Sequence, residues 1–220
     1  MKIKKIAIKI GGSIAFSEKG PKPEYFKRLI SVINKVKPRV DLLILGIGGG
    51  RYIRNYYAGL RNLKLSPKQI EWLGVDLLRT NARLLSFLFS GKPVFDLNKV
   101  PRAKVLTVAG IKPGRSSDAN CAFLAKKFKV DLFIMLTDVA GLYTEDPKRY
   151  KDAKLIKKTS FSGLEKFLPK KVSPGKYGVI DPMALKIMKR SKIHTFIVNG
   201  KNPKIILDIL KGKRRGTEIY

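Results

Sequence analysis

Three glycine-rich loops, each placed after an apolar stretch, are the part of this sequence best suited to hold a phosphate. They are Gly11-Gly12-Ser13, Gly48-Gly49-Gly50 and the segment 110–114. Glycine lets backbone N–H groups approach an anion closely, and the N-terminus of a following helix adds a favourable dipole. None of the loops matches the Walker or the dinucleotide-binding pattern, and tight turns alone can explain one glycine pair. Three loops at corresponding strand ends nevertheless indicate a phosphate-rich ligand.

Basic residues stand close to these loops in the sequence. Lys9 lies two residues before the first glycine pair, within an apolar strand pattern where a lysine needs an anionic partner or a route to solvent. Arg51 and Arg54 follow the glycine triplet, and a guanidinium can bind a phosphate through two hydrogen bonds. Lys186 sits one turn into a later helix. The plain alternative for each is a surface position, because 47 of the 220 residues are Lys or Arg.

The stretch 105–147 supplies two further polar loops. An apolar strand at 105–108 runs into a Gly/Pro loop at 109–115, Ser117 and Asp118 open a helix, and a second strand at 130–136 ends at the loop 137–141. In open α/β sheets, ligands bind at the carboxyl ends of parallel strands. Gly, Ser and Asp are also common in ordinary turns, but two such loops separated by one crossover favour a site.

Alternating strand and helix patterns continue along the chain. In the segment 3–10, Ile6, Ile8 and Ile10 share one face and Ala7 and Lys9 the other. Ser66 and Gln69 form a capping box that opens a long helix ending at 89, and Asp181-Pro182 opens a later helix. Further strands are expected at 41–47, 94–97, 154–156, 195–198 and 216–219, the last at an edge, and helices at 21–37, 51–60, 160–167 and 203–210; 169–178 is expected to be a loop. This alternation predicts an α/β fold, a three-layer αβα sandwich with a mainly parallel central sheet.

Length and composition set further bounds. At 220 residues with 44% hydrophobic content, the chain fits one α/β domain, or two lobes sharing one sheet. A formal charge of +31 favours polyanionic partners, although solvated helix faces account for most of the cations. The single cysteine, Cys121, excludes an internal disulfide framework and suits a reducing cytosol. No apolar window is long enough for a membrane span, and the N-terminus is typical of a strand rather than a signal peptide.

The order of these motifs resembles the amino acid kinase superfamily and, within it, the archaeal-type uridylate (UMP) kinases. The matching segments are K-I-G-G-S at 9–13, G-G-G-x-x-x-R at 48–54, L-G-V-D-L-L-R-T-N-A at 73–82, P-G-R-S-S-D-A at 113–119, T-D-V-A-G-L-Y-T-E-D-P at 137–147, V-I-D-P-M-A-L-K-I at 179–187 and G-T-E-I at 216–219. Each motif is modest alone. Their order and spacing together cover nearly the whole chain and are specific for the superfamily.

The resemblance implies phosphoryl transfer from ATP to UMP with Mg²⁺, in a cytoplasmic homo-oligomer, a dimer or a hexamer. It implies one domain over 1–220, with an acceptor-binding lobe at about 1–120 and an ATP-binding lobe at about 121–220. It assigns catalysis to Lys9, Asp118 and Lys186; UMP binding to Gly48, Gly49, Arg54, Glu71, Ile111, Ser116 and Ser117; ATP binding to Gly11, Gly12, Ser13, Thr137, Asp138, Tyr143, Asp146 and Pro147; and metal binding to no side chain. Asp118 would orient the two catalytic lysines.

Some positions depart from the family pattern. Ala140 replaces the usual second acid of the ATP loop, Glu71 the usual Asp, and Leu78 and Ile111 stand where hydroxyl residues are common, which bears on base selectivity. The only histidine, His194, is far from the glycine triplet, which argues against the isopentenyl phosphate kinase branch. Two alternatives stay open: a kinase of another small phosphate monoester, such as an isoprenoid or cofactor precursor, and a basic nucleic-acid-binding or regulatory protein that retains the fold. Intact Lys9, Asp118 and Lys186 disfavour the second.

Overall fold

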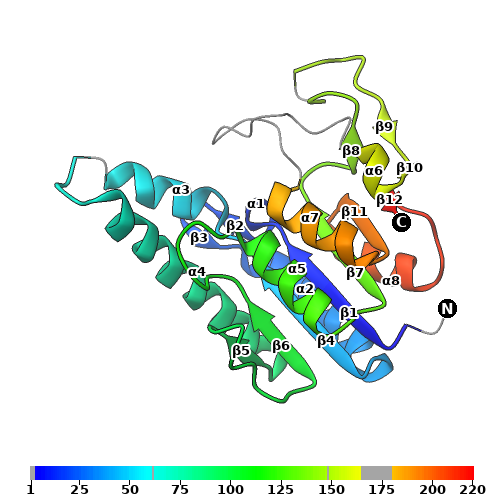
Figure 1. Cartoon of the computed structure of the whole chain (residues 1–220), viewed down its shortest axis with the longest axis horizontal. Coiled ribbons are helices and arrows are strands. Elements are labelled where there is room, and N and C mark those ends of the chain that lie inside the picture. Colours follow the sequence, from blue (N-terminus) through cyan, green and yellow to red (C-terminus); the bar gives the residue numbers. More distant parts are fainter. Residues whose placement is uncertain (1–2, 61, 148, 165–179) are drawn as a thin grey trace.

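The central element of the structure is the strand β1 (Lys5–Ile10), which lies inside an eight-stranded sheet (Figure 1). The structure is a computed structural model that describes residues 3–60, 62–147, 149–164 and 180–220. Within these residues the strand order is β10-β12-β11-β7-β1-β4-β6-β5. Every neighbouring pair is parallel except β11 with β12. The predicted three-layer αβα sandwich with a mainly parallel sheet is therefore confirmed.

The elements follow the alternation expected from the sequence. The other strands of the large sheet are β4 (Leu42–Ile47), β5 (Lys92–Val94), β6 (Val105–Val108), β7 (Leu132–Thr137), β10 (Lys158–Thr159), β11 (Thr195–Asn199) and β12 (Thr217–Ile219). The helices are α1 (Gly12–Ala15), α2 (Pro23–Val36), α3 (Gly50–Gly59), α4 (Pro67–Phe89), α5 (Ser117–Lys127), α6 (Phe161–Leu164), α7 (Pro182–Ser191) and α8 (Ile205–Leu210), with a 3₁₀ turn η1 (Lys37–Arg39). Two small hairpins pair β2 (Phe16–Ser17) with β3 (Gly20–Pro21) and β8 (Leu142–Tyr143) with β9 (Leu155–Ile156).

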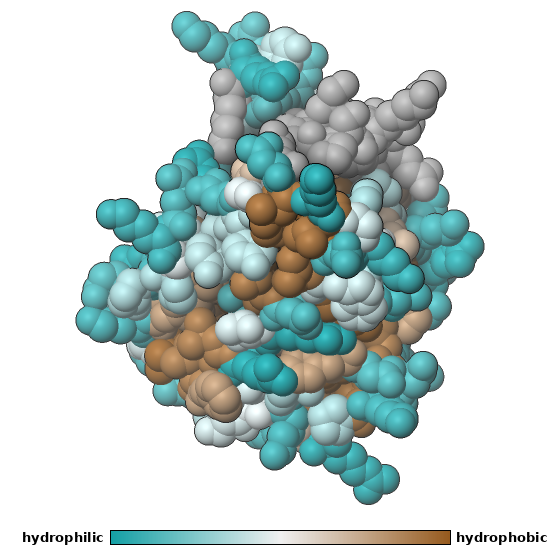
Figure 2. Space-filling model, turned by 90° about the vertical axis from the view of Figure 1, so that its left-hand side faces the viewer, coloured by the Kyte–Doolittle hydropathy of each residue, from teal (hydrophilic) through white to brown (hydrophobic). Residues whose placement is uncertain are grey.

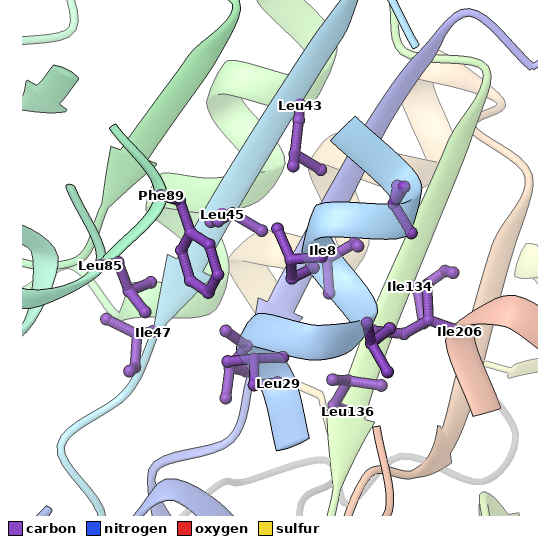
Figure 3. Packing of buried hydrophobic residues seen from close by; sticks show 14 of the residues in the cluster. Ile8, Leu29, Leu43, Leu45, Ile47, Leu85, Phe89, Ile134, Leu136 and Ile206 are labelled. Atoms are coloured by element: carbon purple, nitrogen blue, oxygen red, sulfur yellow. The ribbon is translucent and has the colours of Figure 1, made fainter. Parts of the chain in front are cut away.

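Alternating side chains of the strands fill two separate cores, one on each face of the sheet. Ile8 of β1 and Leu45 of β4 point toward α2, α4 and α8, where they pack with residues such as Leu29 and Phe89 (Figure 3). Ala7 lies on the opposite face with α5 and α7. Burying one such aliphatic side chain contributes about 1.5–3 kcal/mol, so period-two alternation fixes which face each helix must cover.

Helix ends follow local chemistry. The Ser66 hydroxyl accepts a hydrogen bond from the Gln69 backbone N–H while the Gln69 side chain reaches back to the Ser66 N–H, so the predicted capping box is confirmed. Asp181 caps α7 by accepting from the Ala184 N–H at 2.8 Å. These caps fix where the long α4 and the later α7 begin, and therefore which of their faces point to the sheet.

The direction of the chain reverses between two neighbouring strands. After β1 the chain moves to β4 and then to β5, with α2 and α4 on one face of the sheet. After β6 it crosses to β7 and then to β11, with α5 and α7 on the other face, as right-handed crossovers require. The switch point lies between β1 and β7. In doubly wound sheets the ligand crevice opens outside the carboxyl ends of the strands at this point.

Two predictions about strands near the edges of the sheet are wrong. The strand expected at 94–97 is β5 at Lys92–Val94, which begins two residues earlier and contains Pro93. Proline is tolerated there because β5 is the edge strand, where one side needs no N–H donor. The strand at the C-terminus was expected at an edge, but β10 pairs with its outer side. The loop expected at 169–178 and the end of the helix expected at 160–167 lie outside the described residues.

Candidate active site

The glycine loops after β1 and β4 lie against each other at the carboxyl edge of the sheet. A Cβ added to Gly12 would collide with the backbone of Gly49 and Gly50, and one added to Gly48 would come within 3.0 Å of the Gly12 nitrogen. Gly50 has φ of 63°, in the left-handed region that favours glycine. Glycine is therefore required here for backbone-to-backbone approach. The two loops together form a surface of main-chain atoms beside the N-terminus of α3, of the kind that accommodates phosphate oxygens.

Lys9 meets Asp118 beneath these loops. The alternation of β1 turns Lys9 to the α5 face, and α5 crosses over β4 and β1 between β6 and β7. The Lys9 ammonium and the Asp118 carboxylate form an ion pair whose side chains are 12% and 16% exposed. Gly46 lies opposite Lys9 in the strand register, and its lack of a side chain leaves the space that Lys9 and Cys121 occupy. The lysine in the core strand thus has the anionic partner that its position demands.

The N-terminus of α5 is capped by Ser116 rather than by Asp118. The Ser116 hydroxyl accepts a hydrogen bond from the Ala119 N–H at 3.0 Å. The neighbouring Ser117 hydroxyl would lie 3.5 Å from a Cβ placed on Gly48. Because Ser116 caps the helix, the Asp118 carboxylate is available to pair with Lys9. Ser117 stands where a ligand on the second glycine loop would meet it.

Two buried asparagines fix the loops from below, and the interpretation of the sequence assigned no role to either. The Asn81 side-chain amide donates to the Gly48 carbonyl at 3.3 Å, and that of Asn120 donates to the Ala109 carbonyl at 2.7 Å. Both side chains are less than 9% exposed. Asn81 belongs to the motif at 73–82, so the signal was present; only the fold reveals that its target is the glycine triplet.

Arg79, in the same motif, ties the loop after β6 to α4. Its guanidinium donates to the Ile111 carbonyl at 3.2 Å and pairs with Asp76 at 3.1 Å. It also lies over the rings of Trp72 and Phe95, at 5.6 and 5.7 Å from their centroids. The Ile111 side chain itself is buried in the core, whereas Lys112 and Gly114 of the same loop are exposed.

The loop after β7 completes the crevice on the other side of β1. The Gly11 N–H donates to the Leu136 carbonyl at 2.8 Å, which extends the β1–β7 ladder into the first glycine loop. The Thr137 hydroxyl donates to the Val139 carbonyl at 2.9 Å and so shapes the turn. Asp138 lines a cleft of about 500 Å³ together with Ser13. The cleft is also lined by basic side chains, namely Lys19, Lys22, Arg51 and Lys201.

The remaining residues assigned by resemblance lie further out. Tyr143 is half-buried in β8, and Asp146 pairs with Arg149 at 3.8 Å near the half-buried Pro147. Figure 1 places this β8–β9 hairpin and the α3–α4 tip on different sides of the molecule. Arg54 and Lys186 are exposed. In the part of the chain that the structure describes, Lys186 forms no ion pair with Asp118, so its catalytic role stays a prediction.

Glu71 lies on the exposed side of α4, beside α3. The ring of Tyr57 occupies the space over Gly74 where any larger residue would place its side chain. Burial raises the pKa of the Tyr57 hydroxyl, and the Glu71 carboxylate raises it further. Glu71 is therefore close to the acceptor side of the crevice, one helix away from the glycine triplet.

The donor set indicates how a metal could be accommodated. Among the described residues, no group of three or more His, Cys, Asp or Glu side chains could hold a metal ion. Mg²⁺ commonly keeps several waters and binds through substrate phosphates. The arrangement is compatible with Mg²⁺ bound to nucleotide phosphates, and it offers no carboxylate cage to the metal. No helix in the described ranges is long and apolar enough to cross a membrane.

Two stacked glycine loops, a paired lysine and a doubly wound sheet form a site suited to binding phosphate groups. The model of the amino acid kinase family matches residues 97–199. The uridylate kinase of Methanothermobacter thermautotrophicus is 35% identical, with 95% of this chain and 96% of that protein covered; that of Sulfurisphaera tokodaii is 33% identical, with 98% of both covered. The crystal structure of the Archaeoglobus fulgidus uridylate kinase superposes with a TM-score of 0.81 at 31% identity, covering all of both chains. The chain belongs to the amino acid kinase family, in its archaeal uridylate kinase branch.

Proposed function

We propose that this protein is a UMP kinase, which transfers the terminal phosphoryl group of ATP to UMP and releases ADP and UDP for pyrimidine nucleotide synthesis. The observation that carries the proposal is the nearly buried Lys9–Asp118 pair directly beneath the two stacked glycine loops. Relatives named uridylate kinase that match over nearly the whole chain support the choice of UMP. Phosphoryl transfer needs alignment and positive charge around the transferring oxygens and little covalent help from protein.

In this mechanism each residue acts on position or charge. The N–H groups of Gly12 and Ser13 face the transferring phosphoryl group, whereas that of Gly11 is bonded to the Leu136 carbonyl. The Lys9 ammonium stabilises the charge that develops on this group. Asp118 keeps Lys9 in place before the nucleotide binds. Lys186, on the exposed side of α7, turns toward the ATP phosphates. Bound Mg²⁺ would neutralise phosphate charge.

The two substrates occupy the two sides of the switch point. The acceptor lies over the first half of the chain, at about 1–120, where Gly48, Gly49 and Arg54 hold the UMP phosphate and Glu71 meets the ribose. Ser116, Ser117 and the backbone at Ile111 flank the base. ATP lies over the second half, at about 121–220. Its contacts are Thr137, Asp138, Tyr143, Asp146 and Pro147.

The proposed enzyme is a cytoplasmic homo-oligomer, a dimer or a hexamer built from dimers. Trp72 and Phe87 on α4 are 39% and 80% exposed. On the face that carries α3 and α4, Figure 2 shows hydrophobic patches between hydrophilic side chains. An exposed phenylalanine on a long helix suits contact with a second copy. A single, buried Cys121 suits a reducing compartment.

An acceptor panel tests the proposal. Purified protein is given ATP and Mg²⁺ with UMP, CMP, dTMP, AMP or isopentenyl phosphate, and ADP formation is followed. UMP should give the highest kcat/KM. A preference for isopentenyl phosphate, or for any acceptor other than UMP, would refute UMP as the substrate while keeping the kinase. Absence of ADP formation with every acceptor would refute both.

A further inference from the structure

The amino-terminal edge of the sheet, opposite the substrate crevice, carries a row of basic loops. Backbone hydrogen bonds place these loops side by side: His194 O accepts from Phe133 N, Lys5 O from Asp131 N, Lys4 O from Asp41 N, and Lys104 O from Leu43 N. The row therefore runs continuously across the starts of β11, β7, β1, β4 and β6. It is named here the amino-edge surface, formed by residues 3–4, 37–41, 101–104, 128–131 and 192–194.

Among the residues that the structure describes, the exposed cations of this surface have no acidic partners. Its exposed basic residues are Lys4, Arg39, Arg102, Lys104, Lys129 and Lys192. None of the six forms an ion pair with any described residue. The surface has two carboxylates, of which Asp131 is engaged by the backbone N–H groups of Lys4 and Lys5 at 2.7 and 2.8 Å. Elsewhere on the chain, several exposed cations are paired, as in Lys27–Glu24 and Arg215–Asp208.

A hollow of about 540 Å³ opens at one end of the surface, between the C-termini of α5 and α7. Lys126, Lys129, Arg190 and Lys192 line it. Helix C-termini favour nearby cations, which accounts locally for the lysines in this hollow. That effect does not account for Lys4 and Lys104, which precede strands. A common anionic partner accounts for all of them.

We propose that the amino-edge surface binds the phosphate backbone of a double-stranded nucleic acid without reading its sequence. Five adjacent strands span four spacings of about 4.8 Å, or about 19 Å. Each strand of a duplex places one phosphate about every 3.4 Å along the helix axis, so about six base pairs lie alongside the row and its six cations. The proposal is independent of the kinase reaction, because the crevice lies at the opposite edge of the sheet.

The side chains favour a duplex over other polyanions. The exposed large hydrophobic residues of the described chain lie outside the amino-edge surface. Binding of unpaired bases relies on aromatic side chains that stack with them, and firm attachment to a membrane relies on apolar side chains that insert. The surface offers charge alone, which suits phosphates on a regular duplex.

The test compares two triple variants that remove the same charge. K104Q/K129Q/K192Q changes the amino-edge surface, whereas K64Q/K68Q/K157Q changes exposed lysines on the carboxyl-end side. Binding of a fluorescent 20-base-pair duplex of mixed sequence is measured by anisotropy at several salt concentrations. Each lost phosphate contact should reduce the slope of log K against log salt by about 0.9. The first variant should therefore lose about 2.7 of the slope and bind roughly 10²-fold more weakly at 0.1 M salt, with its kinase activity unchanged.

Several outcomes would overturn the proposal. Equal weakening by the control variant would assign binding to total charge rather than to this surface. If the wild-type protein does not bind the duplex at low salt, the proposed site does not exist. Tighter binding of a 20-nucleotide single strand would contradict the duplex geometry. Binding to vesicles of phosphatidylglycerol and phosphatidylcholine, with none to the duplex, would identify a membrane as the partner.

Discussion

Lys9 and Asp118 form a nearly buried ion pair that joins the central strand to the first turn of α5, directly below the stacked glycine loops. Burying two charges costs desolvation energy that their attraction barely offsets, and hydrophobic replacements are often no less stable. Stability alone therefore gives little reason for this pair. Its position at the switch point of the sheet gives a functional one.

Asp118→Asn should lower kcat by about 10² or more while the domain still folds, because lysine placement and local charge are both disturbed. Ser116 caps α5, so loss of the carboxylate leaves the cap intact. Glu24→Gln is the matched control, because it breaks an exposed pair with Lys27 and should change little. The measurement is kcat together with the melting temperature. A near-wild-type kcat in Asp118→Asn would show that Asp118 has no role in catalysis beyond its place in the first turn of α5.

Lys9→Met separates the structural from the catalytic role of the same pair. The single variant leaves a carboxylate without its partner and should lose about 3–5 kcal/mol of stability as well as about 10² or more in kcat. The double variant Lys9→Met/Asp118→Asn removes both charges, so it should regain part of the stability and none of the activity. Urea unfolding and steady-state kinetics on the three proteins measure this. Recovery of activity in the double variant would contradict a direct role for Lys9.

Asn81→Ala tests whether the glycine triplet needs support from α4. Loss of the hydrogen bond to the Gly48 carbonyl leaves a buried acceptor unsatisfied, at a cost of about 1–3 kcal/mol. The loop that we assign to the acceptor phosphate should loosen, raising KM for UMP by roughly tenfold with a smaller effect on KM for ATP. Ser86→Ala, which removes a buried hydroxyl of the same helix bonded to the Arg83 carbonyl, is the control. Equal kinetics in the two variants would show that Asn81 only stabilises α4.

Two helix caps of the same kind allow a paired comparison. Ser66 caps α4 and Ser116 caps α5, each with a hydroxyl that accepts a backbone N–H. Either serine replaced by alanine should lose about 1 kcal/mol of stability. Ser116→Ala should in addition lower kcat, because it unsettles the turn that carries Asp118, whereas Ser66→Ala should not. The readout is the ratio of kcat between the two variants, which have matched stability. Equal kcat values would show that the α5 turn has no role in catalysis.

The sequence predicts the layers of this fold well because its apolar alternation is strong. Ile6, Ile8 and Ile10 on one face, with Ala7 and Lys9 on the other, suffice to place β1 between two cores. The edge of the sheet is harder to predict, because Pro93 argues locally against a strand. The segment becomes a strand only by pairing with its neighbour β6. Pairing of β10 with β12 depends on residues some sixty positions apart and leaves no local pattern.

For the candidate site, residue types were visible but mutual contacts were not. Lys9 could be recognised as a core lysine in need of an anion, whereas its partner depends on how far α5 crosses the sheet. The crossover from β6 to β7 passes over two strands, β4 and β1, and this brings Asp118 above Lys9. Asn81 stood in a recognised motif, yet its bond to Gly48 requires the packing of α4 against β4. Such long-range placement is set by the whole core rather than by spacing.

The buried Cys121 thiol, next to the Lys9–Asp118 pair, should be inaccessible to reagents in the folded protein. Burial raises the pKa of the Cys121 thiol, the Lys9 ammonium opposes this, and the Asp118 carboxylate adds to it. The native protein should therefore react with a thiol reagent at pH 8 only when it unfolds, so that labelling and unfolding occur at the same urea concentration. Fast labelling without urea would contradict the packing of Cys121 against Gly46.

The raised pKa of the Cys121 thiol makes the free energy of unfolding decrease at high pH. In the unfolded chain the thiol ionises near its ordinary pKa of about 8.5, whereas the folded protein keeps it protonated to higher pH. The contribution of Cys121 is therefore complete below about pH 8.5 and decreases as the pH rises further. From pH 8.5 to 9.5 the wild type should lose about 1 kcal/mol relative to Cys121→Ala. Urea unfolding of both proteins at the two pH values measures this difference; parallel changes would show that the thiol ionises equally in the folded and unfolded states.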